Sequence, residues 1–204
     1  MGYKTVDLCC PGCGSPVSTD MDICKCCGRP VVITSFSDVS TMTTIDLSKY
    51  QRSYEKLAND NPDNPPVLNS LGICYLVRGN YERAFNTFES SIDSDPDNAL
   101  SYFFAAVSLL QGKKAFLCAR QSIDKAVEYL TTAVSIGEGE NLSETGLFYY
   151  FLAYIAYDYF SRKHLNINPN FSDYLVQAKL HGVAQGDIDS LHATLKVPAP
   201  SELG

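Results

Sequence analysis

The chain has 204 residues, of which 45% are hydrophobic, and a formal net charge of -7. This length is enough for one sizeable domain with a small appendage, or for two modest domains, and it supports a real hydrophobic core. The 16 Lys and Arg residues are outnumbered by 23 Asp and Glu residues, so the chain as a whole has no electrostatic footprint for a phosphate backbone. Nucleic acid is therefore disfavoured as the main partner, although a local basic patch can exist within an acidic total.

Neither a membrane nor a secretory pathway is indicated by the sequence. The N-terminal residues contain no apolar signal core and no cleavage-site pattern, which predicts a cytoplasmic protein. The most apolar run, residues 146–157, is too short to span a bilayer and is rich in Tyr, whose hydroxyl prefers a polar partner. We therefore expect this run to form a buried or groove-lining helix.

The first motif with chemical content is a pair of Cys-x2-Cys sequences near the N-terminus. Together they have the spacing C-x2-C-x10-C-x2-C, formed by Cys10, Cys13, Cys24 and Cys27. Each pair is followed by Gly, which permits the tight turn that points backbone amides toward thiolate sulfur. Four thiolates suit a tetrahedral Zn²⁺ and leave no open coordination position, so the spacing predicts one structural zinc ion.

Residues 9–33 resemble a zinc ribbon. The resemblance implies that short hairpins carry the two Cys-x2-Cys turns, with strands at residues 17–19 and 30–33. So short a segment has too little core to fold without its metal. Cys9 and Cys26 each precede a predicted ligand, and we expect them to be bystanders. A disulfide cluster, which needs an oxidising compartment, and a redox or iron–sulfur site stay open as alternatives.

The composition changes after the ribbon. Half of residues 35–46 are Ser or Thr and no helical period is present, which predicts a linker over residues 35–47. Ser48 and Gln51 then have the spacing of a capping box, and the apolar residues that follow recur on one helical face. We therefore expect a helix from residue 48 to about residue 59.

The strongest pattern lies between residues 65 and 98. Its marked positions are Leu68, Leu71, Gly72, Tyr75, Ala84, Phe88 and Pro96. This pattern resembles a tetratricopeptide repeat, which is a pair of antiparallel helices. The resemblance implies that Gly72 lets the facing helix approach closely and that Phe88 fills the seam. Gly79 should end the first helix, and Asn80 should cap the second.

Weaker versions of the same pattern continue along the chain. Tyr102 and Leu109 occupy first-helix offsets of a second, divergent repeat, which Gly112 should end. The partner helix comes eight residues late, so either it is lengthened at its start or a loop is inserted at residues 112–119. The Gly-Glu-Gly sequence at residues 137–139 should then break the chain.

A third repeat is the weakest. Ser143 is expected to cap its first helix and Ser172 its second. A last helix over residues 187–195 would cover the exposed end, because each repeat buries its apolar face only against a neighbour. The predicted fold is therefore mainly α, a stack of about eight helices with a small β ribbon. The predicted domains are a ribbon (1–34), a linker (35–47), a helical domain (48–196) and a tail (197–204).

The resemblance also implies a concave groove, lined by first-helix residues that lie beside the packing positions. These are Asn69, Ile73, Phe103, Phe104, Val107, Tyr150, Phe151, Tyr154 and Tyr157. Such an aromatic groove predicts binding of a peptide or helix of another protein. The chain's own terminal helix or a partner in a homo-oligomer are alternative occupants, and plain core packing is the alternative to a groove.

The sequence contains no recognisable catalytic pattern. His164, His181 and His192 have no metal or triad spacing, and no phosphate loop or hydrolase motif is present. We therefore predict a non-enzymatic adaptor that binds a protein in the helical groove and uses the ribbon as a second contact module. The alternative is a nucleic-acid-binding regulatory protein, since ribbons often contact DNA or RNA, but residues 1–34 have a formal net charge of zero.

Overall fold

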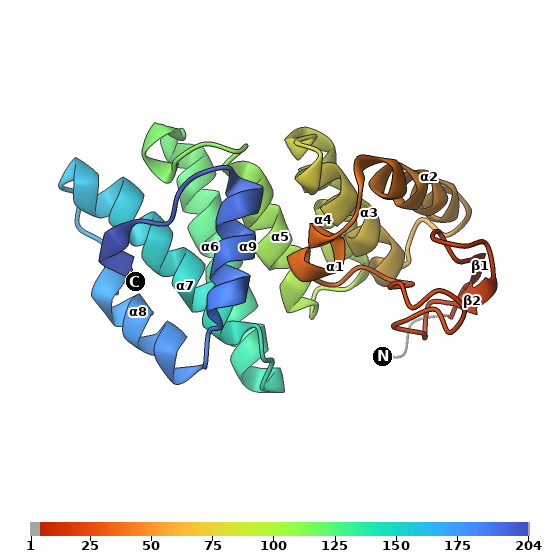
Figure 1. The fold of residues 1–204 in the computed structure, drawn as a ribbon. Helices are drawn as coiled ribbons and strands as arrows, with labels where there is room; N and C mark the ends of the chain where they lie inside the picture. The colour runs from red at the N-terminus through yellow and green to blue at the C-terminus, as the bar shows by residue number, and fades with distance from the viewer. Residues whose placement is uncertain (1–4, 204) are drawn as a thin grey trace. The chain divides into compact units, whose positions relative to one another are not determined.

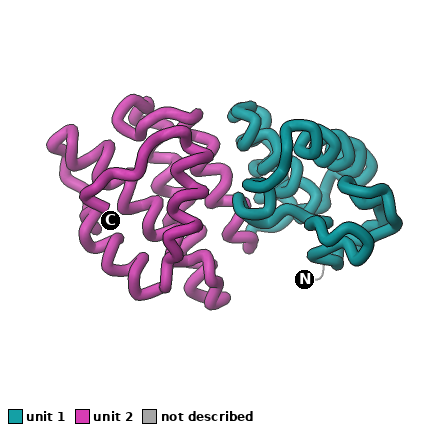
Figure 2. The backbone as a smooth tube through the Cα atoms, in the orientation of Figure 1, with its two compact units in different colours: residues 1–96 teal, residues 97–204 magenta. Residues whose placement is uncertain are grey.

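A computed structural model describes residues 5–203 and divides into two compact units, residues 1–96 and residues 97–204 (Figure 2). The first four residues of the predicted ribbon and the last residue of the predicted tail lie outside the described residues. Within the described part the chain is mainly helical, with helices α1 to α9 and one antiparallel pair of strands (Figure 1). The predicted fold class is therefore confirmed. No helix of the described part is long and apolar enough to cross a membrane.

Unit 1 begins with a small hairpin and continues as helices. The two strands pair with Leu8 opposite Val17, and both side chains are buried in a small cluster with Cys10 and Cys24. The helices α2 and α3 pack together, and α3 forms an antiparallel pair with α4. The elements are β1 (Asp7–Cys9), β2 (Pro16–Ser18), α1 (Phe36–Ser40), α2 (Thr44–Asp60), α3 (Pro65–Val77) and α4 (Tyr81–Ser94).

The prediction of a linker without helical structure at residues 35–47 is corrected, because this segment contains the short helix α1. Ser35 caps this short helix, and Asp38 completes a capping box by accepting a hydrogen bond from the Ser35 backbone. Phe36 and Val39 turn into the protein and are buried. In this Ser/Thr-rich segment a serine caps the helix, and burial of two apolar side chains within one turn stabilises it.

The predicted start of the next helix is also corrected. Thr43 caps α2, because its side chain accepts a hydrogen bond from the Asp46 backbone N–H at 3.1 Å. Ser48, the predicted cap, lies inside the helix and donates its hydroxyl to the Thr44 carbonyl. Two cap-competent residues lie close together in this sequence, and the one further upstream gives the longer helix.

The α3–α4 pair matches the repeat pattern closely. Asn64 caps α3 and Pro65 occupies its first turn, where no backbone N–H is required. Gly79, with φ of +79°, ends the first helix as predicted. A Cβ placed on Gly72 would lie 2.5 Å from a ring carbon of Phe88, so only glycine allows this approach of the two helices. The prediction for Gly72 and Phe88 is confirmed.

Unit 2 contains two further helical pairs and a terminal helix. The pairs are α5 with α6 and α7 with α8, and α6 also packs against α7. The helices are α5 (Ala99–Leu109), α6 (Arg120–Glu140), α7 (Thr145–Ile155), α8 (Phe171–Leu180) and α9 (Gln185–Leu195). A short 3-10 turn, η1 (Ala115–Leu117), lies between α5 and α6, so the eight-residue offset comes from an inserted loop.

Three predicted helix boundaries in unit 2 are wrong. The glycines at 137 and 139 do not break the helix but lie within α6. Asn141, which follows the last residue of α6, has a left-handed backbone conformation and caps the helix. Gly137 packs against Thr145, where a Cβ would lie 2.6 Å from the hydroxyl oxygen, so close packing offsets the roughly 1 kcal/mol helix penalty of glycine. Ser143 does not cap α7, which begins after Glu144, and Asn170 rather than Ser172 caps α8.

The C-terminal part of unit 2 folds back on the helices. Helix α9 lies against α7 and buries Ile188, Leu191 and Leu195, as predicted (Figure 1). The predicted tail is also held, because Val197 is buried and the short turn η4 (Ser201–Leu203) buries Leu203. The tail therefore belongs to the packed structure of unit 2.

Candidate metal centre and helical binding surface

The two Cys-x2-Cys turns have the same backbone geometry. In each turn the glycine N–H donates to the carbonyl of the first cysteine, from Gly14 to Cys10 and from Gly28 to Cys24, both at 2.8 Å. Both glycines have positive φ, +81° and +69°, which glycine adopts without strain. The local sequence thus builds two equivalent turns, and each presents a pair of thiols.

The two turns bring four sulfur atoms together. The Sγ atoms of Cys10, Cys13, Cys24 and Cys27 all lie within 4.8 Å of one another. The Cys10–Cys27 distance is 3.7 Å and the Cys13–Cys24 distance is 3.8 Å. Zinc–sulfur bonds of about 2.3 Å place the sulfurs of a tetrahedral site about 3.8 Å apart, whereas a disulfide needs about 2 Å. The four residues therefore fit a tetrahedral metal ion and do not fit disulfide pairing.

The four thiols have different surroundings. Burial raises the pKa of the Cys10 thiol to about 12, whereas hydrogen bonding with Ser15 lowers the pKa of the Cys13 thiol to about 6. The Ser15 hydroxyl lies 3.3 Å from the Cys13 sulfur. A bound divalent cation deprotonates coordinating thiols outright, so it would remove this difference. Cys9 and Cys26 are exposed and are not members of the cluster.

The ribbon packs on α2 and α3 within unit 1 through residues 30–33, which we call the strap. Tyr50 donates its hydroxyl to the Pro30 carbonyl at 2.8 Å, and Tyr54 donates to the Val31 carbonyl at 2.7 Å. From α3, the Ser70 hydroxyl accepts the Ile33 backbone N–H at 2.9 Å. The strap is thus held by side chains of two helices.

The strand predicted at residues 30–33 is wrong for the same reason. Only an isolated bridge between Ile23 and Pro30 forms, because the strap's backbone groups are paired with helix side chains instead of a second strand. The sequence predicted that the apolar residues following Ser48 share one helical face, but it did not give partners for the hydroxyls of Tyr50 and Tyr54. The available signal was that a buried tyrosine hydroxyl requires an acceptor.

An ion pair also joins the ribbon to α2. Arg29 Nη1 lies 2.8 Å from Asp46 Oδ1. Hydrogen bonding with Arg29 and with the Thr43 hydroxyl lowers the pKa of the Asp46 carboxyl. Because the Arg29 side chain is partly exposed to solvent, this pair adds orientation more than stability.

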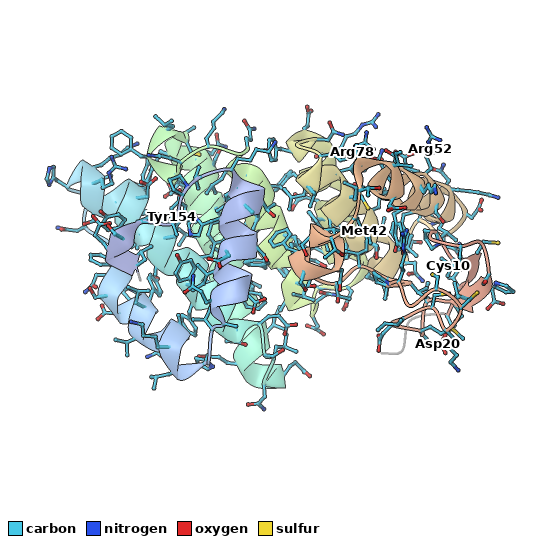
Figure 3. The ribbon with its side chains drawn as sticks, viewed as in Figure 1. Cys10, Asp20, Met42, Arg52, Arg78 and Tyr154 are labelled. Carbon is cyan, nitrogen blue, oxygen red and sulfur yellow. The ribbon has the colours of Figure 1, made fainter. Side chains whose placement is uncertain are left out.

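The residues predicted to line a groove are mostly buried. Asn69 and Ile73 are buried in unit 1, and in unit 2 Tyr157 alone among the predicted groove residues is partly exposed. The Tyr150 hydroxyl lies 2.9 Å from Nε2 of His192, and the Tyr154 ring meets the His192 ring edge-on with the ring centroids 5.2 Å apart. Figure 3 labels Tyr154 among the side chains of unit 2. Helix α9 therefore covers this part of α7, which was one of the alternative occupants considered from the sequence.

The phenylalanines of the predicted groove form core contacts. The Phe103 ring centroid lies 5.2 Å from Phe104, 5.1 Å from Phe148 and 6.0 Å from Phe151. Val107 is buried on the same helix. Such edge-to-face and tilted pairs are typical of a packed interior. The alternative of plain core packing therefore describes these residues of α5 and α7.

Comparisons with known proteins support the helical part of this description. A model of the tetratricopeptide repeat matches residues 53–86, which run from α2 through α3 into α4. The human protein "Tetratricopeptide repeat protein 6" is 30% identical over 125 residues, which is 60% of this chain and 22% of that protein. The bovine protein "BBSome complex member BBS4" is 35% identical over 66 residues, which is 32% of this chain and 12% of that protein.

The chain therefore contains a tetratricopeptide repeat, and it spans about a fifth and about an eighth of these two curated relatives. Repeats of this kind stack helical pairs into extended surfaces that serve protein–protein interaction. The predicted resemblance of the helical domain is confirmed, and its general role as an interaction domain is supported.

Proposed function

We propose that this protein is a non-enzymatic adaptor, in which tetratricopeptide-like helices bind a protein partner and a ribbon with one structural Zn²⁺ forms a second contact module. The observation that carries the proposal is the match of a tetratricopeptide repeat model to residues 53–86, beside the α3–α4 pair in which Gly72 packs against Phe88. Proteins with this repeat typically act as scaffolds, which favours binding over catalysis. The names of the two relatives of this chain likewise refer to a tetratricopeptide repeat and to membership of a complex.

The proposal of a structural rather than catalytic zinc ion rests on the donor set. Four thiolates from two rigid turns occupy all positions of a tetrahedral ion, so bound zinc would cross-link the turns and leave no position for a substrate. None of the eight cysteines forms a disulfide in the structure, so the four clustered thiols are available to a metal ion.

Native mass spectrometry of the full chain tests the zinc assignment. We expect the mass of one zinc ion on the wild type, and at least about tenfold weaker zinc retention for Cys13→Ser. Cys26→Ser is the matched control, because Cys26 is also exposed but lies outside the cluster. Equal loss in both variants would contradict the assigned ligands, and a visible iron–sulfur absorption band would contradict zinc.

Each unit is proposed to offer its own binding surface on the first helices of its pairs, α3 in unit 1 and α5 and α7 in unit 2. Because Tyr150 and Tyr154 lie under α9, a partner reaches α7 beside α9, at Tyr157, or by displacing that helix. A homo-oligomer would use the same surfaces. Neither a membrane nor an enzyme substrate enters the proposal.

The adaptor role is tested by affinity capture from native cells after nuclease treatment. Tyr157, which continues α7 and is partly exposed, tests the proposed surface, and Leu180 on α8 is an exposed control outside it. We expect one partner to survive the nuclease and to be lost from Tyr157→Glu but not from Leu180→Glu. Loss of all partners on nuclease treatment would favour the nucleic-acid alternative.

The nucleic-acid alternative has little electrostatic support in the ribbon. Of its cations, Arg29 forms an ion pair with Asp46 on α2, which compensates its charge. Acidic residues balance the others in the sequence of residues 1–34. A salt-dependent mobility shift of DNA or RNA by the full chain, abolished by Lys25→Glu, would revive it.

A further inference from the structure

A small cavity lies in unit 2 between the end of α7 and the C-terminal segment. Its volume is about 210 Å³, and its lining residues are Lys114, Tyr154, Tyr157, Asp158, Arg162 and residues 198–202. We call residues 197–203 the tail segment. The cavity is thus bounded on one side by helical residues with donor groups and on the other by the tail segment.

The helical wall of this cavity has an unusual backbone. At Ala156–Phe160 the chain continues α7 as a π-helical turn, η2, and Tyr157 and Asp158 belong to it. The Ser161 N–H reaches back to the Ala156 carbonyl, five residues earlier. Single π-helical turns occur frequently at functional sites, because the extra residue re-aims side chains that a regular helix would place elsewhere.

Asp158 holds Arg162 in place at the cavity. Asp158 is buried, and its two carboxylate oxygens accept from Arg162 Nη1 at 2.6 Å and from the Phe116 backbone N–H at 2.9 Å. The Arg162 guanidinium also lies over the Phe116 ring, 5.0 Å from its centroid. One of five guanidinium N–H donors is used by Asp158, and the group is fixed before any ligand arrives. The Asp158–Arg162 pair has no net charge, so at this pair an anion would be bound by the remaining guanidinium N–H donors rather than by a net positive charge.

Other cations gather around the same loop. Lys163 Nζ lies 5.0 Å from the Phe116 ring centroid and 3.8 Å from the Tyr159 ring centroid. Lys113 and Lys114 lie on the inserted loop and are exposed. In a chain with a net charge of -7, this local excess of Lys and Arg attracts acidic groups.

The tail segment shows how an acidic peptide fits this site. Val197 and Leu203 are both buried, at the two ends of the segment. The Leu203 N–H donates to the Pro200 carbonyl at 3.1 Å, which forms the turn that carries Glu202. Glu202 lines the cavity together with Tyr157 and Arg162, and interactions with these two groups lower the pKa of its carboxyl, the Tyr157 hydroxyl being the larger cause. The segment therefore combines one carboxylate with apolar anchors.

We propose that this cavity is a docking site for an acidic peptide segment of a partner protein, one with an extended, proline-containing backbone and a carboxylate followed by an aliphatic residue. In the structure the tail segment occupies part of the site as an intramolecular competitor. The proposal rests on the proposed function, because it names the chemistry of the protein partner. A short tether gives the tail an effective concentration on the order of millimolar, so a partner must bind better than the tail to displace it.

The first test uses full-length variants and a fluorescein-labelled peptide with the sequence of residues 197–203. The opened variant, Glu202→Gln with Leu203→Ser, removes the tail's carboxylate and its buried anchor. We expect fluorescence anisotropy to show at least about tenfold tighter peptide binding to the opened variant than to the wild type, because competition is lost. A peptide with Gln in place of its Glu should bind about tenfold more weakly. Equal binding in either comparison would overturn the proposal.

A matched pair of tyrosines locates the binding. Tyr157→Phe in the opened variant should weaken peptide binding several-fold, because it removes a donor to the carboxylate. Tyr149→Phe is the control, since the Tyr149 hydroxyl also donates to a glutamate, Glu138 at 2.7 Å, but does not line the cavity. Equal weakening by both substitutions would overturn the assignment of this cavity.

A second measurement uses the wild type and so does not depend on the folding of a variant. Millimolar peptide should displace the tail and accelerate its removal by carboxypeptidase, whereas the Gln peptide should not. No acceleration would overturn the proposal.

Two further outcomes would assign the site to another ligand. Tighter binding of a labelled oligothymidine than of the peptide would indicate nucleic acid. A wild-type dimer that dissociates in the opened variant would indicate the tail of a second copy. If the peptide fails while a nuclease-resistant partner persists in the capture experiment, only this site is rejected and the adaptor function stands.

Discussion

The two units of this protein cover their helices in different ways. In unit 1 the covering segment is the strap, an irregular piece of chain held by hydroxyl-to-backbone hydrogen bonds from Tyr50, Tyr54 and Ser70. In unit 2 it is a regular helix, α9, held mainly by buried Leu191 and Leu195. The strap is continuous with the ribbon that carries the proposed zinc site, whereas α9 is held by burial of apolar surface. The two units therefore cover their helices by different interactions, polar hydrogen bonds in unit 1 and apolar burial in unit 2, and different treatments should weaken them.

Metal removal should give the largest difference in stability between the two units. The sequence predicts that residues 9–33 do not fold without zinc, and in the structure the strap ties this ribbon to α2 and α3. We expect chelation to cost unit 1 more than about 3 kcal/mol and to leave unit 2 unchanged, because structural zinc sites contribute folding free energy directly. Hydrogen exchange with mass spectrometry checks this, with protection falling in residues 30–33 and at the strap-facing side of α2.

Zinc added back is the control and should restore the protection. If residues 44–60 exchange at the same rate with and without metal, the ribbon and the helices are energetically independent despite their contacts.

A pair of glycines tests packing in the two units. Gly72→Ala should destabilise unit 1 by about 1–3 kcal/mol, because the added Cβ lies 2.5 Å from the Phe88 ring and overpacks the α3–α4 seam. Gly139→Ala in α6 is the matched control, since no atom lies within 4 Å of its Cβ, and it should be neutral or stabilising by up to about 1 kcal/mol. Urea denaturation measures both. Equal effects would show that helix propensity, not close approach, governs Gly72.

The polar attachment of the strap can be weakened without touching the metal ligands. Tyr54→Phe removes the donor to the Val31 carbonyl and should cost about 1–3 kcal/mol, since a buried acceptor is left unpaired. Ser90→Ala is the control, because Ser90 is exposed and its hydroxyl bonds only within α4, to Asn86. The measurement is the midpoint of thermal unfolding of zinc-loaded protein. A loss as small as that of the control would mean that the hydroxyl bond does not hold the strap.

The packing of α9 in unit 2 should depend on pH, unlike the attachment of the strap in unit 1. Burial lowers the pKa of His192 below its ordinary value of 6.5, and Tyr150, Tyr154 and Asp189 are the titratable groups around it. A depressed folded-state pKa means that stability is fully present above about pH 6.5 and falls as pH drops toward the folded value. We expect a loss of at most about 1.4 kcal/mol per pH unit in unit 2.

Hydrogen exchange of α9 between pH 7 and pH 5, corrected for intrinsic rates, measures this loss. His192→Leu should abolish the pH dependence of α9 while α2 behaves as in the wild type. A pH dependence that persists in His192→Leu would assign it to another group.

Several features were predictable because their cause is local. The C-x2-C spacing with its following glycines brought four sulfurs within 4.8 Å of one another, and Gly72 with Phe88 gave the repeat contact. Helix caps were less predictable, because several residues near each boundary have suitable side chains. Thr43 rather than Ser48, and Asn170 rather than Ser172, made the hydrogen bonds. Local chemistry restricts such choices, but packing of the helix selects among them.

The predicted groove illustrates the same limit. Sequence spacing identified large apolar residues on the first helices, and they do lie in the interior, but spacing does not distinguish a groove lining from a core. Tyr150 and Tyr154 became buried because α9 folds back over α7. Tyr157 escaped this burial and lies at the cavity beside the tail segment. Whether a surface is open depends on which distant segment covers it.

By itself, the amino-acid sequence determined the features that depend on residues close together in the chain. These are the paired cysteine turns, the helical periods and the glycine at the α3–α4 seam. Only the tertiary structure decided that the strap takes its hydrogen bonds from α2 and α3, that α9 covers α7, and that Asp158 holds Arg162 beside the tail segment. These contacts join residues far apart in sequence. Their free energy comes from burial and from pairing of polar groups, which no local pattern encodes.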